Sequence, residues 1–154
     1  MNDKIPIKRS KTLYPLSHEH HQGLLLCWKI RSGYKKSIQI ERIKAYTDWF
    51  YKNNLLPHFN LEENFIFPLL GNDNDLVKKA ITDHRRLKRL FEDTSDINKS
   101  LSLIEEELEK HIRFEERILF NEIEKTASNN ELEMIMKIHS IDSSREEWDD
   151  LFWE

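Results

Sequence analysis

Cysteine, glycine and proline are scarce in this chain of 154 residues, which contains one Cys, three Gly and four Pro. The single cysteine, Cys27, excludes an internal disulfide and a zinc site built on paired thiolates. So few glycines and prolines leave little of the turn chemistry that an all-β fold with many hairpins requires. We therefore expect neither a disulfide-stapled domain nor an all-β domain.

A long apolar run and an excess of positive charge are also missing. The chain has no run of about 18 apolar residues, and Met1–Lys11 lacks the apolar core of a secretory signal. Its 24 basic and 28 acidic residues give a net charge of −4, which argues against a dedicated nucleic-acid binder. We expect a soluble, cytoplasmic protein with no membrane or nucleic-acid partner, folded as a single domain over residues 1–154.

What the chain does contain is helical periodicity, which begins at Leu16 and continues through most of the sequence. It predicts helices at about residues 17–32, 40–70, 75–93, 97–125 and 131–139, followed by an acidic tail that contains tryptophan. Ser17 is the expected N-cap of the first helix, Gly33 is the expected residue after its end, and Pro57 predicts a break near Asn54.

Short links between long helices favour antiparallel neighbours. The predicted fold class is therefore all-α, an antiparallel up-down-up-down four-helix bundle over about residues 16–126. A short extra C-terminal helix and the tail occupy residues 127–154.

Two histidine–glutamate pairs interrupt the apolar faces of these helices. His58 precedes Glu62 by four residues, and His111 precedes Glu115 by the same spacing. Residues four apart lie on one face of a helix, so each pair points an imidazole and a carboxylate in the same direction.

Apolar neighbours indicate that this direction is inward. The residues three and seven positions after His58, His84 and His111 are Leu61 and Phe65, Leu87 and Phe91, and Phe114 and Ile118. In the first helix the segment SHEHH offers His18, His20 and His21, and we select His20 because it lies nearest the mean apolar direction.

The turns are placed so that these residues meet at one depth. The midpoint between residue 60, the centre of the first pair, and His84 is residue 72, inside the Gly71–Asn74 turn. The midpoint between His84 and the second pair falls just after Asp96, and the midpoint between His20 and the first pair lies slightly beyond the Gly33–Ser37 link. In an up-and-down bundle this symmetry predicts convergence.

Four imidazoles and two carboxylates buried together are costly without a partner, because each carboxylate loses several kcal/mol of solvation. Metal ions offset that cost: imidazole suits iron, zinc and copper, and a carboxylate can bridge two ions. The predicted metal ligands are His20, His58, Glu62, His84, His111 and Glu115. Glu63 and Glu116, which follow the two glutamates, are either outer acceptors for these ligands or exposed residues.

At these residues the sequence resembles the hemerythrin-like, or HHE cation-binding, family. The resemblance rests on LSHEHH, LLPHFNLEENFIFPLL, DHRRLKRLF and HIRFEERILF, between Leu16 and about Lys125. It implies a four-helix bundle with a non-heme di-iron centre, in which the four histidines are terminal ligands and the two glutamates bridge. Two iron ions are the implied cofactors, with other divalent metals as an alternative.

The chain departs from the oxygen-carrying hemerythrins at one point. These have a second histidine four residues from the helix 3 ligand, whereas here Lys88 follows His84 by four and Ala80 precedes it by four. A six-ligand site with an extra open position fits this sequence, as does a fifth histidine supplied by His18 or His21.

Three functions follow from this interpretation. The first is a binding protein, not an enzyme, that takes up O₂, NO or a related diatomic in sensing, storage or stress response. The second is an iron-handling or redox enzyme-like protein, for example one that donates iron during repair of iron–sulfur clusters. The third is a helical interaction protein whose buried histidines are vestigial or hold another metal. Nothing in the sequence indicates a substrate pocket, so no catalytic residue is assigned.

Overall fold

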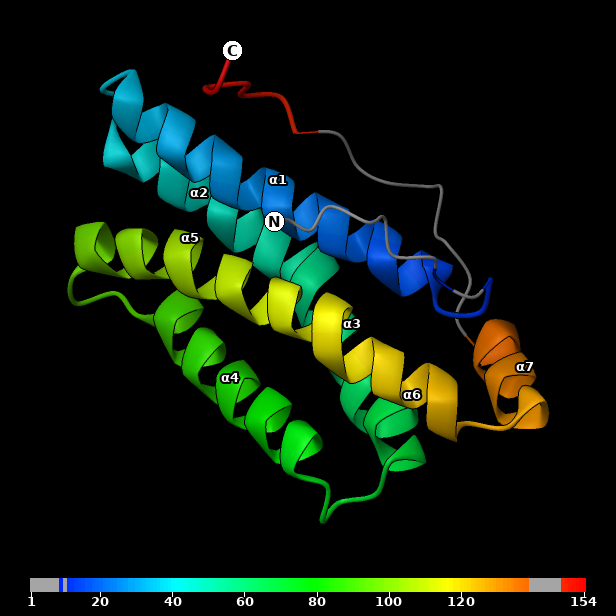
Figure 1. The fold of residues 1–154 in the computed structure, drawn as a ribbon. Coiled ribbons are helices and arrows are strands. Elements are labelled where there is room, and N and C mark those ends of the chain that lie inside the picture. Colours follow the sequence, from blue (N-terminus) through cyan, green and yellow to red (C-terminus); the bar gives the residue numbers. More distant parts are fainter. Residues whose placement is uncertain (1–8, 10, 139–147) are drawn as a thin grey trace, which may run out of the picture.

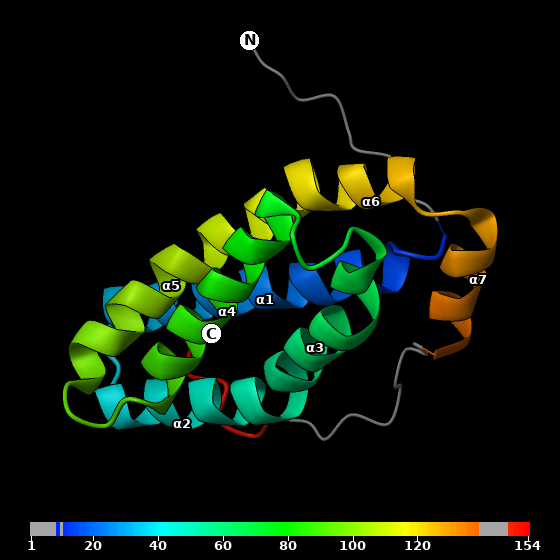
Figure 2. The same cartoon turned by 90° about the horizontal axis from the view of Figure 1, so that it is seen from below.

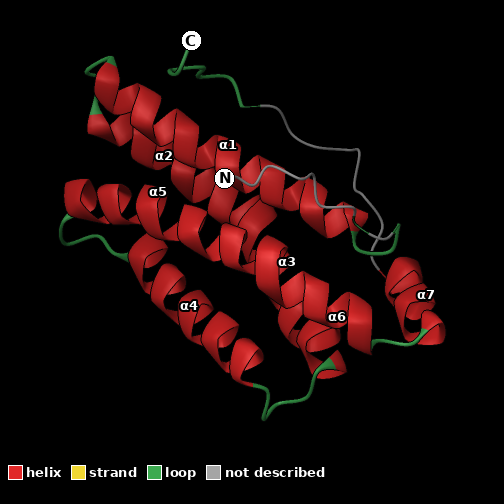
Figure 3. Cartoon of the chain, in the orientation of Figure 1, coloured by secondary structure: helices red, strands yellow, loops and turns green. Residues whose placement is uncertain are grey.

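The computed structural model describes Arg9, residues 11–138 and residues 148–154, and all regular structure in these residues is helical (Figure 3). The predicted all-α class is therefore confirmed. None of the described helices combines the length and the apolar character that crossing a bilayer requires. The elements are α1 (Tyr14–Lys35), α2 (Ile40–Phe50), η1 (Tyr51–Leu55), α3 (Leu56–Leu61), η2 (Glu62–Ile66), η3 (Phe67–Leu69), α4 (Asp75–Glu92), α5 (Ile97–Phe114), η4 (Glu115–Leu119), α6 (Phe120–Thr126) and α7 (Asn129–Ile138).

Several elements follow one another without a break, so residues 40–69 and residues 97–126 each form one continuous helical segment. Together with α1 and α4 they make four long segments that run back and forth (Figure 1). The α5 helix packs against α1, α4 and α2, and α1 also packs against α2. Figure 2 shows the same arrangement from below, with α7 beyond the ends of the long segments.

Both predicted ends of the first helix, Ser17 and Gly33, are wrong, because α1 begins three residues earlier and ends two residues later. Pro15 stands in the first turn, where its missing N–H costs no helical hydrogen bond. Gly33 is buried inside the helix, and a Cβ atom there would lie 2.7 Å from Cδ1 of Ile43. Gly33 therefore allows α1 and α2 to approach closely, while Ser37, with φ 57°, has the left-handed conformation after the helix.

The starts of α4 and α5 lie where the sequence predicts them. Gly71 has φ 89°, and the side chain of Asn74 accepts hydrogen bonds from two backbone N–H groups at the start of α4. The side chain of Asp96 caps α5 in the same way. The interruption expected near Asn54 is the π turn η1, which directly precedes the turn that contains Pro57.

Two further π turns begin at the glutamates of the paired motifs. The N–H of Phe67 bonds to the carbonyl oxygen of Glu62, and the N–H of Phe120 bonds to that of Glu115, each five residues back. A π turn inserts one extra residue into an α-helix and is frequent at functional sites. The two segments therefore widen at equivalent points, next to the predicted site.

The π turns overturn one prediction about the apolar stripe. Phe65 and Ile118 were expected to be buried, but they are 43% and 49% exposed. The extra residue rotates the following side chains by about 100°. Ile66 and Leu119, one position later, are fully buried in their place.

The core consists of two apolar clusters, and every long segment contributes to both. One cluster includes Ile30, Phe59, Leu87 and Leu108. The other includes Leu16, Ile66, Ala80 and Leu119. Along each segment the change from one cluster to the other falls at the predicted site residues, so a polar layer lies between two apolar ones.

The C-terminal part contains the expected short helix, α7, in which Ile135 is buried. The segment 148–154 packs its tryptophans against Tyr46 of α2, with Trp148 and Trp153 at ring-centroid distances of 5.7 and 5.0 Å. His139, the last residue of the predicted C-terminal helix, lies outside the described residues.

Candidate metal centre

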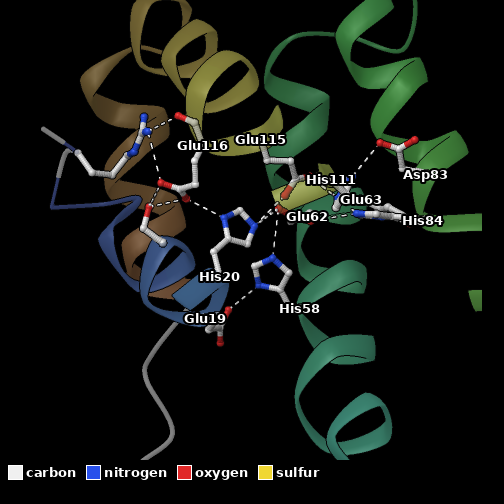
Figure 4. A network of polar contacts seen from close by, with 12 residues as sticks. Glu19, His20, His58, Glu62, Glu63, Asp83, His84, His111, Glu115 and Glu116 are labelled. Atoms are coloured by element: carbon white, nitrogen blue, oxygen red, sulfur yellow. Dashed lines mark hydrogen bonds and ion pairs between the residues drawn. The ribbon is translucent and has the colours of Figure 1, made fainter. Parts of the chain in front are cut away.

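The six predicted ligands meet in the polar layer between the two apolar clusters (Figure 4). They come from all four long helical segments, and none is more than 4% exposed. They are His20 on α1, His58 on α3, Glu62 on η2, His84 on α4, His111 on α5 and Glu115 on η4. The structure therefore brings together every residue that the spacing and the resemblance selected.

These side chains form two groups that could each hold a metal ion, and the groups share Glu62 and Glu115. One group adds His20 and His58, and the other adds His84 and His111. Within each group the ligand atoms lie within 4.8 Å of one another. Two histidines for each position and two shared carboxylates form the layout of a dinuclear site.

The Nε2 atoms of the four histidines face the shared carboxylates. Nε2 of His20 lies 2.8 Å from Oε1 of Glu115, and Nε2 of His111 lies 3.2 Å from Oε2 of the same residue. Nε2 of His58 lies 3.2 Å from Oε2 of Glu62, and Nε2 of His84 lies 3.1 Å from its Oε1. The four Nε2 atoms and the carboxylate oxygens, which are the atoms able to bind metal, therefore point into one small space.

Most of these atoms have no hydrogen-bond partner although they are buried. The unpartnered atoms are Nε2 of His58, His84 and His111, both carboxylate oxygens of Glu62 and Oε2 of Glu115. Buried polar atoms in native proteins are nearly always bonded, and leaving several unpaired in one place is costly. A pair of cations would satisfy them, so the residues present fit the metal centre that the resemblance implies.

Each imidazole is held from behind by another carboxylate at its Nδ1 atom. The four Nδ1 pairs are His20 with Glu116 at 2.6 Å, His58 with Glu19 at 2.7 Å, His84 with Glu63 at 2.6 Å and His111 with Asp83 at 3.0 Å. A carboxylate cannot donate, so Nδ1 carries the hydrogen and donates it. When a metal ion replaces the proton on Nε2, the lone pair of that nitrogen faces the centre, which is the orientation that metal-bound histidines show.

The four outer carboxylates follow a repeated pattern in the sequence. Glu63 and Glu116 each follow a central glutamate, and each supports a histidine on another segment. Glu19 and Asp83 each precede a histidine, and each supports the histidine of a paired motif. From the sequence, Glu63 and Glu116 were either outer acceptors or exposed residues, and the structure shows that they are outer acceptors. The roles of Glu19 and Asp83 were not predicted, although each stands directly before a predicted ligand, His20 or His84.

Carboxylates around the centre raise the pKa values of the histidines. Burial lowers the pKa of His20, but the nearby carboxylates of Glu115, Glu116 and Glu62 outweigh it and raise the pKa well above its ordinary value. Burial likewise opposes the charged form of His58, and the carboxylates of Glu62 and Glu19 raise its pKa to about 9. Without metal, protons on these histidines therefore balance the buried negative charge.

The two central carboxylates stay ionised. Burial disfavours the charged form of Glu115, and for Glu62 the neighbouring Glu115 adds to that effect. The imidazoles of His111, His20 and His84 nevertheless hold the pKa of Glu115 well below the ordinary value. The same opposition lowers the pKa of Glu62, where the charge of His58 acts against burial. A metal ion that replaces the histidine protons takes over this role.

The other candidate ligands lie outside the centre. His21 is exposed and His18 is half-buried, and neither belongs to the two groups found among the described residues. Lys88 instead approaches Glu63, with 3.9 Å between Nζ and Oε2, and Ala80 is fully buried. Within the part of the chain that the structure describes, the geometry therefore gives six candidate ligands and no fifth histidine.

Comparisons with models of known protein families, with curated proteins and with solved structures found no match. The candidate metal centre therefore rests on the geometry of its own side chains. Two buried groups of histidine and glutamate, each able to hold an ion, are the firm result.

Proposed function

We propose that this chain is a hemerythrin-like protein whose centre holds two iron ions and binds O₂ or a related diatomic such as NO. In this proposal the four long helical segments form an antiparallel up-down-up-down bundle around the centre, with α7 as an addition. The six residues of the polar layer are the protein ligands. Sensing, storage and stress response are the roles that reversible binding would serve.

One observation carries this proposal: four imidazoles and two shared carboxylates converge in a buried layer and leave their inner atoms unpartnered. Imidazole and carboxylate together suit iron, and carboxylates shared between two positions favour a dinuclear centre over two separate sites. Four donor residues for each position leave room for a small ligand.

The protein would hold the two ions in place, balance their charge and keep water away from them. Glu62 and Glu115 would bridge the ions, and the outer carboxylates would fix the direction of each Nε2 lone pair. The apolar clusters on both sides would keep bulk water from the layer. Bound iron would supply the electrons for reversible binding of a diatomic ligand.

Two measurements test the proposal, first the iron content of the protein and then its binding of O₂. Protein purified without chelators should contain about two irons per chain, since each of two positions has its own pair of histidines. The reduced protein should then give an optical band with O₂ that disappears when O₂ is removed. A protein that contains no iron and takes up none on reconstitution would contradict the proposal.

Iron handling is the second candidate, and the small number of protein ligands favours it. Ala80 and Lys88 occupy the positions at which a further histidine would bind the ion next to His84. An ion with fewer protein ligands leaves more readily. Transfer of iron to an apo iron–sulfur acceptor, without a reversible O₂ band, would favour this function.

A further inference from the structure

Arg9 precedes the first helix, yet its side chain is only 4% exposed. Its guanidinium donates to Oδ1 of Asn121 at 3.1 Å and to Oε1 of Glu124 at 2.9 Å. It also donates to the backbone carbonyl of Glu116 at 2.5 Å, inside the π turn η4. A buried guanidinium with three acceptors attaches Arg9 firmly to the segment that provides Glu115.

The same arginine is connected to a predicted metal ligand through Glu116. Nη2 of Arg9 lies 3.5 Å from Oε1 of Glu116. The other carboxylate oxygen of Glu116, Oε2, accepts from Nδ1 of His20 at 2.6 Å and from the hydroxyl of Ser17 at 2.8 Å. The guanidinium carbon also lies 5.5 Å from the centre of the Phe120 ring, which stacks on the imidazole of His20 at 5.1 Å. Arg9 therefore touches both groups that set the orientation of His20.

The equivalent position on the other side of the centre is built more loosely. Glu63 supports His84 as Glu116 supports His20, but its cation is Lys88 at 3.9 Å. The Lys88 side chain is 30% exposed, and no hydrogen bond joins it to Glu63. A half-buried lysine at this distance fixes a carboxylate much less than a buried arginine does.

We propose that Arg9 is a positioning residue that strengthens metal binding selectively at the position formed by His20 and His58. The proposal rests on the proposed function, because it requires a centre with two ions. Arg9 fixes the carboxylate of Glu116 and the ring of Phe120, and these fix the direction of the His20 lone pair. Arg9 thereby makes the two metal positions unequal in affinity.

Stepwise metal binding by matched variants tests this proposal. The full chain, Arg9→Ala and the control Lys88→Ala are titrated with Co²⁺ against a competing chelator. Because Arg9 acts through Glu116, Arg9→Ala should weaken binding of one of the two ions by about tenfold, the lower end of the effect of losing a partner directly behind a ligand. Binding of the other ion should be nearly unchanged. Lys88→Ala should change both affinities by less than about threefold, because a solvent-accessible ion pair contributes little. The affinities of Arg9→Lys should lie between those of Arg9→Ala and of the full chain.

A proton signal separates positioning from a general loss of structure. In the protein loaded with Zn²⁺, the four Nδ1–H groups bonded to carboxylates should give downfield ¹H resonances, and the variant Glu116→Gln identifies the one from His20. Arg9→Ala should shift or broaden that resonance alone. If the variant fails to fold, Glu124→Ala, which removes one of the three acceptors of Arg9, should give a smaller weakening of binding of the same ion.

The possible results are distinct. Equal weakening of both ions by Arg9→Ala, or no weakening, would overturn the proposal while the full chain still binds two ions. Failure of the full chain to bind Co²⁺ or iron would instead overturn the proposed function, and the positioning role with it.

Discussion

Glu19 and His58 lie 39 positions apart in the chain, yet Oε1 of Glu19 accepts from Nδ1 of His58 at 2.7 Å. The contact joins α1 to α3 at the depth of the polar layer. It also determines which nitrogen of His58 faces the shared carboxylates. Packing of the helices and preparation of the candidate centre therefore depend on the same contact.

Loss of Glu19 should weaken metal binding without removing a ligand. We expect Glu19→Ala to reduce the affinity of the ion near His58 by about 10–100-fold, because its imidazole loses the acceptor that orients it. Glu19→Gln keeps an acceptor oxygen and should have a smaller effect. Chelator competition measures both, and Glu41→Ala, at an exposed position of α2, is the control that should leave both affinities unchanged.

Removal of a shared carboxylate should have a larger effect. Glu115 belongs to both groups, so Glu115→Ala should abolish binding of at least one ion and weaken the other. Elemental analysis after reconstitution measures the stoichiometry. His21→Ala, at an exposed position of the same helix as His20, should retain the full metal content. Full metal content in the Glu115 variant would show that this carboxylate is no ligand.

The metal-free protein should lose stability as the pH rises from about 6.5 to about 9. The pKa of His58 is raised from 6.5 to about 9, so its stabilising contribution is complete below pH 6.5 and is lost as the pH passes the folded value. Metal replaces these protons, so the gain in Tm on adding metal should be larger at pH 8.5 than at pH 6.5. Thermal unfolding with and without chelator measures this, and a metal-free Tm that rises over this range would contradict the expectation.

Gly33→Ala should destabilise the contact of α1 with α2 and the C-terminal segment. The added Cβ would lie 2.7 Å from Cδ1 of Ile43 and 3.0 Å from Cε1 of Phe152, and overpacking of this kind costs about 1–3 kcal/mol. Gly23→Ala is the matched control, because its Cβ would meet only the terminal Cδ1 of Ile112, at 2.8 Å, which can rotate away. Urea unfolding should give a smaller loss for Gly23→Ala, and the reverse order would contradict this description of the packing.

The helices and the convergence of the six residues could be predicted from the sequence because both depend on regular spacing. The turns at Gly71 and Asp96 lie midway between the residues that meet, so a simple symmetry was sufficient. The π turns could not be predicted, since one extra residue in a helical turn leaves the apolar pattern almost unchanged. For this reason the prediction that Phe65 and Ile118 are buried was wrong.

The outer contacts were harder to predict for a different reason. Glu19, Asp83 and Arg9 are polar residues whose environment depends on how separate segments pack. Periodicity places Glu19 and Asp83 beside buried histidines, but it does not show which ring each reaches. Arg9 lies in a polar stretch before the first helix, where no pattern indicates that a side chain is buried.

Anomalous diffraction at the iron absorption edge, on crystals of the protein purified without chelators, tests the central claim most directly. The account predicts two peaks about 3.5–4 Å apart, as in other dinuclear sites. Both peaks should contact Glu62 and Glu115, one should contact His20 and His58, and the other should contact His84 and His111. Crystals that remain without a peak at these residues after soaking in Fe²⁺, or that show iron only elsewhere, would contradict it.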